Sequence, residues 1–177
     1  MNTSSRFAVA IHILIYLSMR RRMDGQPTKS DQLAQSADTN PVVIRRLMGQ
    51  LREAGLVVSK SGPNGGFLLE ANPEMITLAD IHDAVEEKGT LFHLHYGCPM
   101  EACPVGGNVQ DVLNEVFDEA KAALRKVLAQ KTLAEVAHEV AERSGLTEML
   151  EAGMTQEEIL AQYEFVDGVA TLKSLVA

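Results

Sequence analysis

The sequence predicts a mainly α-helical protein with one small β unit, an α+β fold, and three observations support this class. Apolar residues recur at helical spacing in the first third of the chain, a strand–turn–strand pattern follows them, and a heptad repeat comes later. With 177 residues, 46 % of them apolar, the chain is long enough for one small domain and an oligomerisation arm.

Two helices are expected at the N-terminus. Residues 4–20 carry apolar side chains at the spacing of a largely buried helix, and a turn containing Gly25 and Pro27 ends it. Thr28 is then expected to be the N-cap of a short second helix, with Asp31 as its partner in a weak capping box.

A third helix is expected to begin at Pro41 and to end before Gly55. Asn40 is a favourable N-cap, and Pro41 suits the first helical position because its missing N–H would have no partner there. Gly55 is a typical residue after a helix end. The apolar residues follow the spacing of one buried face: Ile44, Leu47, Met48 and Leu51. The second and third helices together form a helix-turn-helix pattern.

A hairpin is predicted directly after the third helix. Residues 56–58 and 67–69 have the composition of strands, and residues 61–66, Ser-Gly-Pro-Asn-Gly-Gly, have that of a turn. A hairpin in this position is typical of a wing. Residues 1–75 are therefore predicted to form a winged helix-turn-helix domain that binds DNA.

The third helix is expected to lie in the major groove, with Arg45, Arg46 and Gln50 pointing away from its apolar face. Arginine contacts guanine through two hydrogen bonds, and glutamine contacts adenine in the same way. A solvated helix face is the alternative for the two arginines taken alone. The other residues expected at the duplex belong to the helix ends and the wing: Lys29, Ser30, Thr39, Asn40, Pro41, Val42, Lys60, Asn64, Gly65 and Gly66.

The second half of the chain is predicted to be helical. Residues 76–107 contain a helix capped by Thr77 and an irregular segment with both cysteines, which is a candidate sensor loop. Residues 108–130 are predicted to be a dimerisation helix with a heptad seam, the alternative being a helix that packs on its own domain. Residues 131–177 are predicted to be a helical extension. The seam consists of Val109, Leu113, Val116, Ala120, Ala123 and Val127.

Charge is distributed unevenly along the chain. Residues 1–70 carry 9 Lys and Arg against 5 Asp and Glu, whereas residues 71–177 carry 7 against 19. The net charge of −8 therefore hides a basic N-terminal part, the sign that contact with phosphates requires. Chance asymmetry between solvated surfaces is the alternative.

Several features predict a cytoplasmic protein without a membrane partner. No segment approaches the roughly 20 apolar residues that a membrane span needs. The first apolar stretch is followed, not preceded, by its basic residues at 20–22, which is the reverse of a signal peptide. Two cysteines are too few for the disulfide framework of a secreted protein.

Three segments resemble the Rrf-two (BadM/Rrf-two) family of winged-helix transcriptional regulators. They are Asn-Pro-Val-Val-Ile-Arg-Arg-Leu at 40–47, Leu-Arg-Glu-Ala-Gly-Leu-Val at 51–57 and Ser-Gly-Pro-Asn-Gly-Gly-Phe-Leu-Leu at 61–69. The resemblance covers roughly residues 4–130. It implies a repressor that binds palindromic operator DNA as a homodimer, crossed through the helix at 108–130. The tail beyond residue 132 is longer than the family leads us to expect.

The resemblance also raises the question of a cofactor. Well-known members, an iron–sulfur cluster regulator and a nitric-oxide-sensitive repressor, hold a [2Fe–2S] cluster on three cysteines, but this chain has only Cys98 and Cys103. Histidine can replace cysteine on iron, so His93, His95 and His12 are further candidate ligands for a cluster or another metal. Two alternatives stay open: a thiol switch and inert thiols. In the switch, Cys103 at a helix N-terminus is the reactive thiol and Cys98 resolves it.

Two other classes of protein were weighed. A thiol oxidoreductase needs closely spaced cysteines at a strand-to-helix turn or a cysteine beside a base, and neither pattern is present, so no catalytic residue is predicted. A winged-helix module that binds protein instead of DNA is disfavoured by the basic N-terminal part of the chain and by Arg45 and Arg46.

Overall fold

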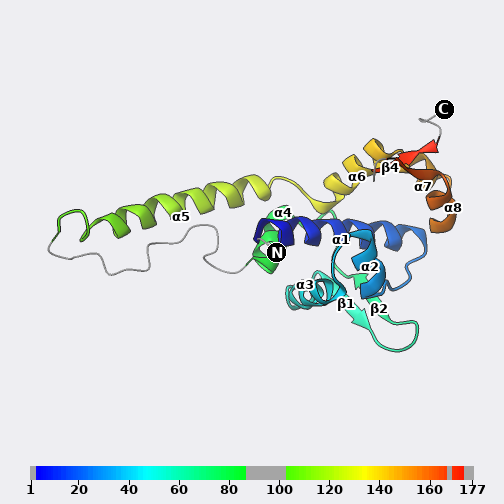
Figure 1. Ribbon diagram of the computed structural model, residues 1–177, viewed down its shortest axis with the longest axis horizontal. Helices are drawn as coiled ribbons and strands as arrows, with labels where there is room; N and C mark the ends of the chain where they lie inside the picture. Colours follow the sequence, from blue (N-terminus) through cyan, green and yellow to red (C-terminus); the bar gives the residue numbers. More distant parts are fainter. Residues whose placement is uncertain (1–2, 87–102, 167–168, 174–177) are drawn as a thin grey trace.

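The computed structural model describes residues 3–86, 103–166 and 169–173 of the chain. The first part folds into a compact helical domain with a hairpin, from which one long helix, α5, projects (Figure 1). Among the described residues, no helix combines the length and the apolar character needed to cross a membrane. The elements of the N-terminal domain are α1 (Thr3–Met23), α2 (Ser30–Ser36), α3 (Pro41–Glu53), β1 (Val57–Lys60), β2 (Gly66–Leu69) and α4 (Leu78–Val85).

The core of this domain is built from one apolar face of each helix. Helix α1 packs against α4, α2 and β2, and α3 packs against α2, α4 and β1. The four residues predicted as the inner face of α3 are all buried, which confirms the helical periodicity. Burial of such faces supplies most of the stability of short helices. The largest fully buried side chains of this core, among residues before α5, are Ile13, Leu14, Leu17, Leu33, Ile44, Leu47, Met48, Leu51, Val57, Ile76 and Ile81.

The ends of α3 form as the sequence predicts. The Asn40 side chain accepts a hydrogen bond from the Val42 N–H at 2.8 Å, and Pro41 occupies the first turn. At the other end, Gly55 has a φ of 74°, and its N–H donates to the Arg52 carbonyl at 2.9 Å. These are local signals, which the sequence carries within a few residues of each end.

The prediction that Thr28 caps α2 is wrong. Lys29 is the N-cap residue, and its N–H donates to Oε1 of Gln32 at 3.0 Å. Thr28 instead pairs with Phe67 of the hairpin: each N–H donates to the other residue's carbonyl, at 3.0 and 2.8 Å. This pairing holds Thr28 in an extended conformation as a short addition to the sheet, which is why the helix begins one residue later.

The hairpin predicted after α3 is present. Strands β1 and β2 are antiparallel, with Val57 opposite Leu69 and Lys60 opposite Gly66. Val57 and Leu69 are buried in the core, whereas Lys60 and the turn beyond it lie in solvent. The hairpin is therefore fixed at its base and free at its tip, as a wing requires.

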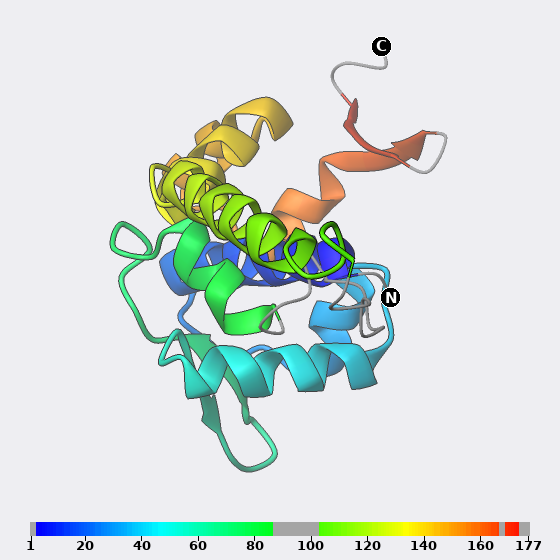
Figure 2. The same ribbon diagram turned by 90° about the vertical axis from the view of Figure 1, so that its left-hand side faces the viewer.

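Helix α5 (Val109–Leu128) coincides with the long helix predicted over 108–130. It extends away from the domain, and no residue of it is buried within the described structure (Figures 1 and 2). Its C-terminal end is held by Arg125, whose Nε donates to Oδ2 of Asp83 on α4 at 2.9 Å. The free part of the helix carries the heptad residues.

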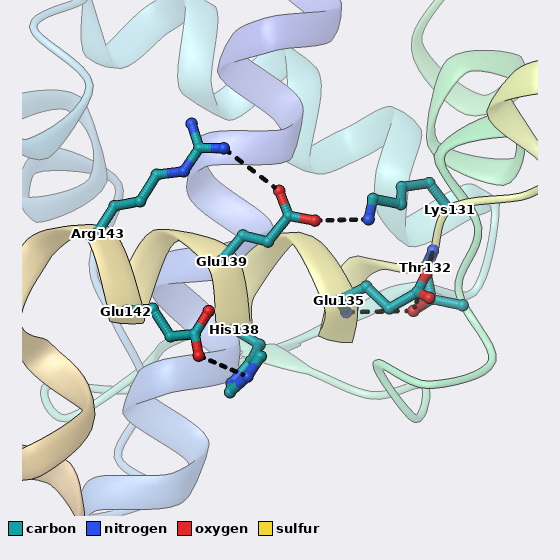
Figure 3. Close-up of polar contacts among 7 residues, drawn as sticks. All are labelled: Lys131, Thr132, Glu135, His138, Glu139, Glu142 and Arg143. Atoms are coloured by element: carbon teal, nitrogen blue, oxygen red, sulfur yellow. Dashed lines mark hydrogen bonds and ion pairs between the residues drawn. The ribbon is translucent and has the colours of Figure 1, made fainter.

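The chain returns to the domain after α5. Leu133, the first residue of α6 (Leu133–Ser144), is fully buried, and α6 packs against α1. The backbone pairs with the segment before α4: the Leu133 N–H donates to Ile76 at 2.8 Å, and the Leu78 N–H donates to Lys131 at 2.9 Å. A capping box between Thr132 and Glu135 starts the helix (Figure 3). The beginning of the predicted extension is thus part of the N-terminal core.

The last part of the chain departs from the purely helical prediction. Within the extension predicted to be helical, α7 (Leu146–Glu151) and α8 (Gln156–Ala161) follow α6. A hairpin of β3 (Tyr163–Val166) and β4 (Val169–Leu172) follows. The Tyr163 hydroxyl donates to the Ser144 carbonyl at 2.5 Å, so β3 is anchored to the end of α6 by a contact between distant residues.

Candidate nucleic-acid interface

Helix α3 presents a polar outer face opposite its buried face. Arg45 and Arg46 are exposed there, and Val42 in the first turn is 63 % exposed. Arg45 lies near the start of α2, with its guanidinium 3.5 Å from the Ser30 hydroxyl and 3.9 Å from a carboxylate oxygen of Asp31. Contacts this long between exposed groups contribute little stability, so Arg45 can turn towards a ligand at low cost.

Gln50 is in a different environment from the arginines. It is half-buried, and its Oε1 accepts a hydrogen bond from Nη2 of Arg6 on α1 at 3.0 Å. Arg6 therefore occupies one of the two lone pairs of the acceptor that an adenine amino group would need. Sequence reasoning missed Arg6, because it is 44 positions from Gln50 and no local pattern links them. Arg6 adds a cation beside the outer face of α3.

The backbone amides at the start of α3 already have partners inside the protein. The Val42 N–H donates to the Asn40 side chain, the Val43 N–H donates to the Asn40 carbonyl at 2.9 Å, and Pro41 has no N–H. The Thr39 N–H donates to Ala34 at 2.9 Å. A phosphate at this end would therefore meet side chains more readily than free amides. The predicted contact residue Lys29 is exposed at the start of α2.

The wing depends on two glycines for its own conformation. Lys60 and Asn64 are exposed at its tip. At Gly66, with φ of 159°, a Cβ would lie 2.6 Å from the Thr28 carbonyl oxygen, and at Gly65 a Cβ would overlap the Lys60 carbonyl. Any side chain at either position would force the backbone to move.

Helix α3 and the wing lie on the same side of the domain, and α5 lies on the opposite side (Figures 1 and 2). Helix α3 and the wing therefore face the same direction, and the contacts of Arg45 with Ser30 and Asp31 link the start of α2 to α3. A helix-turn-helix with an adjoining wing and outward guanidinium groups defines a class of DNA-binding transcriptional regulators.

The predicted sensor residues are only partly described. Cys103 lies in the turn before α5, is half-exposed and is free; the N–H groups of Gly106 and Val105 lower the pKa of its thiol by hydrogen bonding. Cys98, His93 and His95 lie outside the described residues. His12 is on α1, where its Nε2 is 2.9 Å from the Ser36 hydroxyl and burial lowers the pKa of its ring.

The described residues do not fit an iron site. No three His, Cys, Asp or Glu side chains among them are grouped to hold a metal ion. The turn that contains Cys103 lies at the far end of α5 from α1, the helix that carries His12 (Figure 1). One chain therefore does not bring these two candidate ligands together.

Comparison with known proteins places the chain in this class. The model of the Rrf2 family, described as iron-dependent transcriptional regulators, matches residues 3–139. The chain belongs to the Rrf2 family. The family and the relatives below are transcriptional regulators and not enzymes.

The relatives match about three quarters of the chain. It is 38 % identical over 133 residues to the putative HTH-type transcriptional regulator YwnA of Bacillus subtilis, covering 75 % of this chain and 95 % of that protein. It is 26 % identical to the HTH-type transcriptional regulator IscR of Cereibacter sphaeroides, and the match covers 77 % of this chain and 85 % of that protein. The crystal structure of a putative DNA binding protein, 35 % identical in sequence, superposes with a TM-score of 0.58. The superposition covers 74 % of this chain and 97 % of that protein. The family match ends within α6, before α7 begins.

Proposed function

We propose that the protein represses transcription in the cytoplasm by binding a palindromic operator as a homodimer, with α3 in the major groove and the wing on the adjoining backbone. The observation that carries the proposal is the outer face of α3, where Val42, Arg45 and Arg46 are exposed. Helix α3 itself lies on the same side of the domain as the wing (Figure 2). The basic balance of residues 1–70 matches the charge of the duplex.

The homodimer is supported by the exposed apolar face of α5. A helix of 20 residues is about 30 Å long, and this one is attached to its own domain near its C-terminal end. An apolar stripe of this length in water favours association with a second copy, which buries the same stripe twice around a two-fold axis. The most exposed apolar residues of the helix, at 37–63 %, are Val109, Val112, Leu113, Val116 and Val127.

A dimer of this kind explains how a signal would control binding. The two copies of α3 must match half-sites about 34 Å apart, one turn of the duplex. Their separation depends on how α5 is joined to the domain, and the pairing of Lys131 and Leu133 with the segment before α4 fixes that joint. A change at the other end of α5, beside Cys103, would shift the packing between the two helices and with it the fit to DNA.

The dimer and its DNA can be tested together. Light scattering of the wild-type protein should give twice the mass of one chain, and selection from a duplex library with a randomised centre should enrich a palindrome. Leu113→Asp should give a folded monomer with reduced operator affinity, because a charge in the seam is left without water. Asn114→Asp adds the same charge away from the seam and should stay dimeric. A monomeric wild-type protein would contradict the proposal.

A thiol response is a second candidate, supported by the lowered pKa of Cys103. The Cys103 thiolate would attack one oxygen of a peroxide and become a sulfenic acid. The O–O bond breaks in this step, and the other oxygen leaves as water or as an alcohol. The Cys98 thiol would then attack that sulfur and release water as the disulfide forms. Intact mass after peroxide treatment should fall by two hydrogens in the wild type, and Cys98→Ser should stop at the sulfenic acid. No change in mass, or visible absorption by protein purified without oxygen, would contradict this candidate.

A further inference from the structure

Gly49 occupies the middle of the outer face of α3. Because an α-helix repeats every 3.6 residues, positions 42, 46, 49 and 53 fall along one line, opposite the buried face. Gly49 therefore follows the exposed Val42 and Arg46 along the surface that the proposed function assigns to DNA. After proline, glycine is the residue least favourable to a helix interior, so its presence at this central position needs a reason.

The fold of the protein supplies none of the usual reasons. The glycines with positive φ are elsewhere, so the backbone of Gly49 is accessible to any residue. A Cβ built at Gly49 meets no atom within 4 Å. The position is four residues before the last residue of α3 and is not a cap. An alanine here would fit the described structure and would favour the helix.

The wing glycines show the contrast. At Gly66 a Cβ would press on the Thr28 carbonyl, so the protein itself requires a glycine there. At Gly49 the space beside the backbone is open on the outside of the molecule. What restricts that position must therefore come from a partner that covers the outer face of α3.

We propose that Gly49 is the point of closest approach between the α3 backbone and the DNA duplex, and that the absence of a side chain lets the helix sit deeply in the major groove. This inference rests on the proposed function. Charge complementarity identifies the partner, because Arg46 lies on this line, Arg45 lies beside it, and residues 1–70 are basic. Deep seating brings Val42 within reach of base edges, where an aliphatic group packs on a thymine methyl.

The test is a size series at position 49, measured on the duplex that the wild-type protein enriches from a randomised library. Gly49→Ala should raise the melting temperature, because alanine favours the helix. It should lower affinity about tenfold, because an added methyl at a packed interface must push the two surfaces apart. Gly49→Leu should weaken binding further. Opposite changes in stability and affinity would exclude misfolding as the cause.

Two other outcomes have distinct meanings. Unchanged affinity in Gly49→Ala would overturn the inference. Equal losses for Ala and Leu would overturn it too, because they would indicate that helix flexibility matters instead of space. Glu53→Ala, a substitution on the same line in the last turn, is the matched control and should bind at least as well as wild type.

Failure of this inference and failure of the proposed function are distinguishable. If the wild-type protein enriches no duplex, the proposed function fails. If Arg46→Ala weakens binding to the enriched duplex while Gly49→Ala does not, the function stands and the close approach at Gly49 is wrong.

Discussion

Helices α3 and α5 carry the same kind of apolar stripe, but the two stripes differ in burial. In α3 the stripe is buried by α2, α4 and β1 of the same chain, whereas no residue of α5 is buried within the described structure. The proposed function accordingly assigns DNA contact to the polar face of α3 and dimerisation to the apolar face of α5. An amphipathic pattern therefore predicts a helix but does not identify what covers its apolar side.

Matched leucine truncations test this comparison most strongly. Leu47→Ala in α3 should destabilise the protein by about 2–5 kcal/mol. Leu47 is only 1 % exposed, so its truncation leaves a cavity in the core. Leu113→Ala in α5 should instead weaken the dimer, so that it lowers the melting temperature only at protein concentrations at which the wild type is dimeric. Denaturant and thermal unfolding at two protein concentrations measure both. Equal effects at every concentration would show that α5 does not associate.

A substitution in the wing tests how the exposed tip of the hairpin is held to the rest of the domain. Gly66→Ala should cost about 1–3 kcal/mol, because a Cβ would lie 2.6 Å from the Thr28 carbonyl and φ is 159°. Gly65 is as crowded, so Gly65→Ala should act in the same direction. Thermal melts read the loss directly, and a wild-type melting temperature in Gly66→Ala would mean that the contact between the wing and Thr28 is dispensable.

The smallest expected effect is at α6, which carries α5 back to the domain. The Lys131 ammonium bonds Glu139 and lowers the pKa of that carboxyl below its ordinary 4.5 (Figure 3). A lowered folded-state pKa means that the ionised group stabilises the fold above about pH 4.5 and that this contribution is lost as the pH falls through the folded value. Both side chains are partly exposed, so the effect is small.

Glu139→Gln checks this sign. Its stability, measured by urea unfolding between pH 7 and pH 3, should fall less steeply with acid than that of the wild type. Glu142→Gln on the same helix is the control. The Glu142 carboxylate pairs with His138, at 3.3 Å, instead of with Lys131. A steeper acid loss in Glu139→Gln than in wild type would contradict the sign.

The sequence was sufficient where the signal was local. Asn40, Pro41 and Gly55 mark the ends of α3 through bonds to residues a few positions away, and the turn residues of the wing mark its hairpin. Thr28 was assigned wrongly as a cap, because its backbone is held by Phe67, 39 positions later. Tertiary pairing outweighed a weak capping preference at that point.

Contacts between distant residues account for the rest of what was missed. The bond from Arg6 to Gln50 changes the expected role of Gln50, and no spacing in the sequence reveals it. The docking of Leu133 into the N-terminal core joins α6 to the first domain. The hairpin of β3 and β4 follows six helical residues directly, and Tyr163 anchors it to Ser144.

The most direct test of the account is the affinity of arginine variants of α3 for the enriched duplex across a range of salt concentrations. Arg45→Ala and Arg46→Ala should each weaken binding about tenfold or more and relax the preference at their base pairs, with a wild-type affinity that falls steeply as salt rises. Arg52→Ala, in the last turn of the same helix, removes the same charge and should have a smaller effect. Wild-type affinity and sequence preference in both variants would contradict the claim that the outer face of α3 reads DNA.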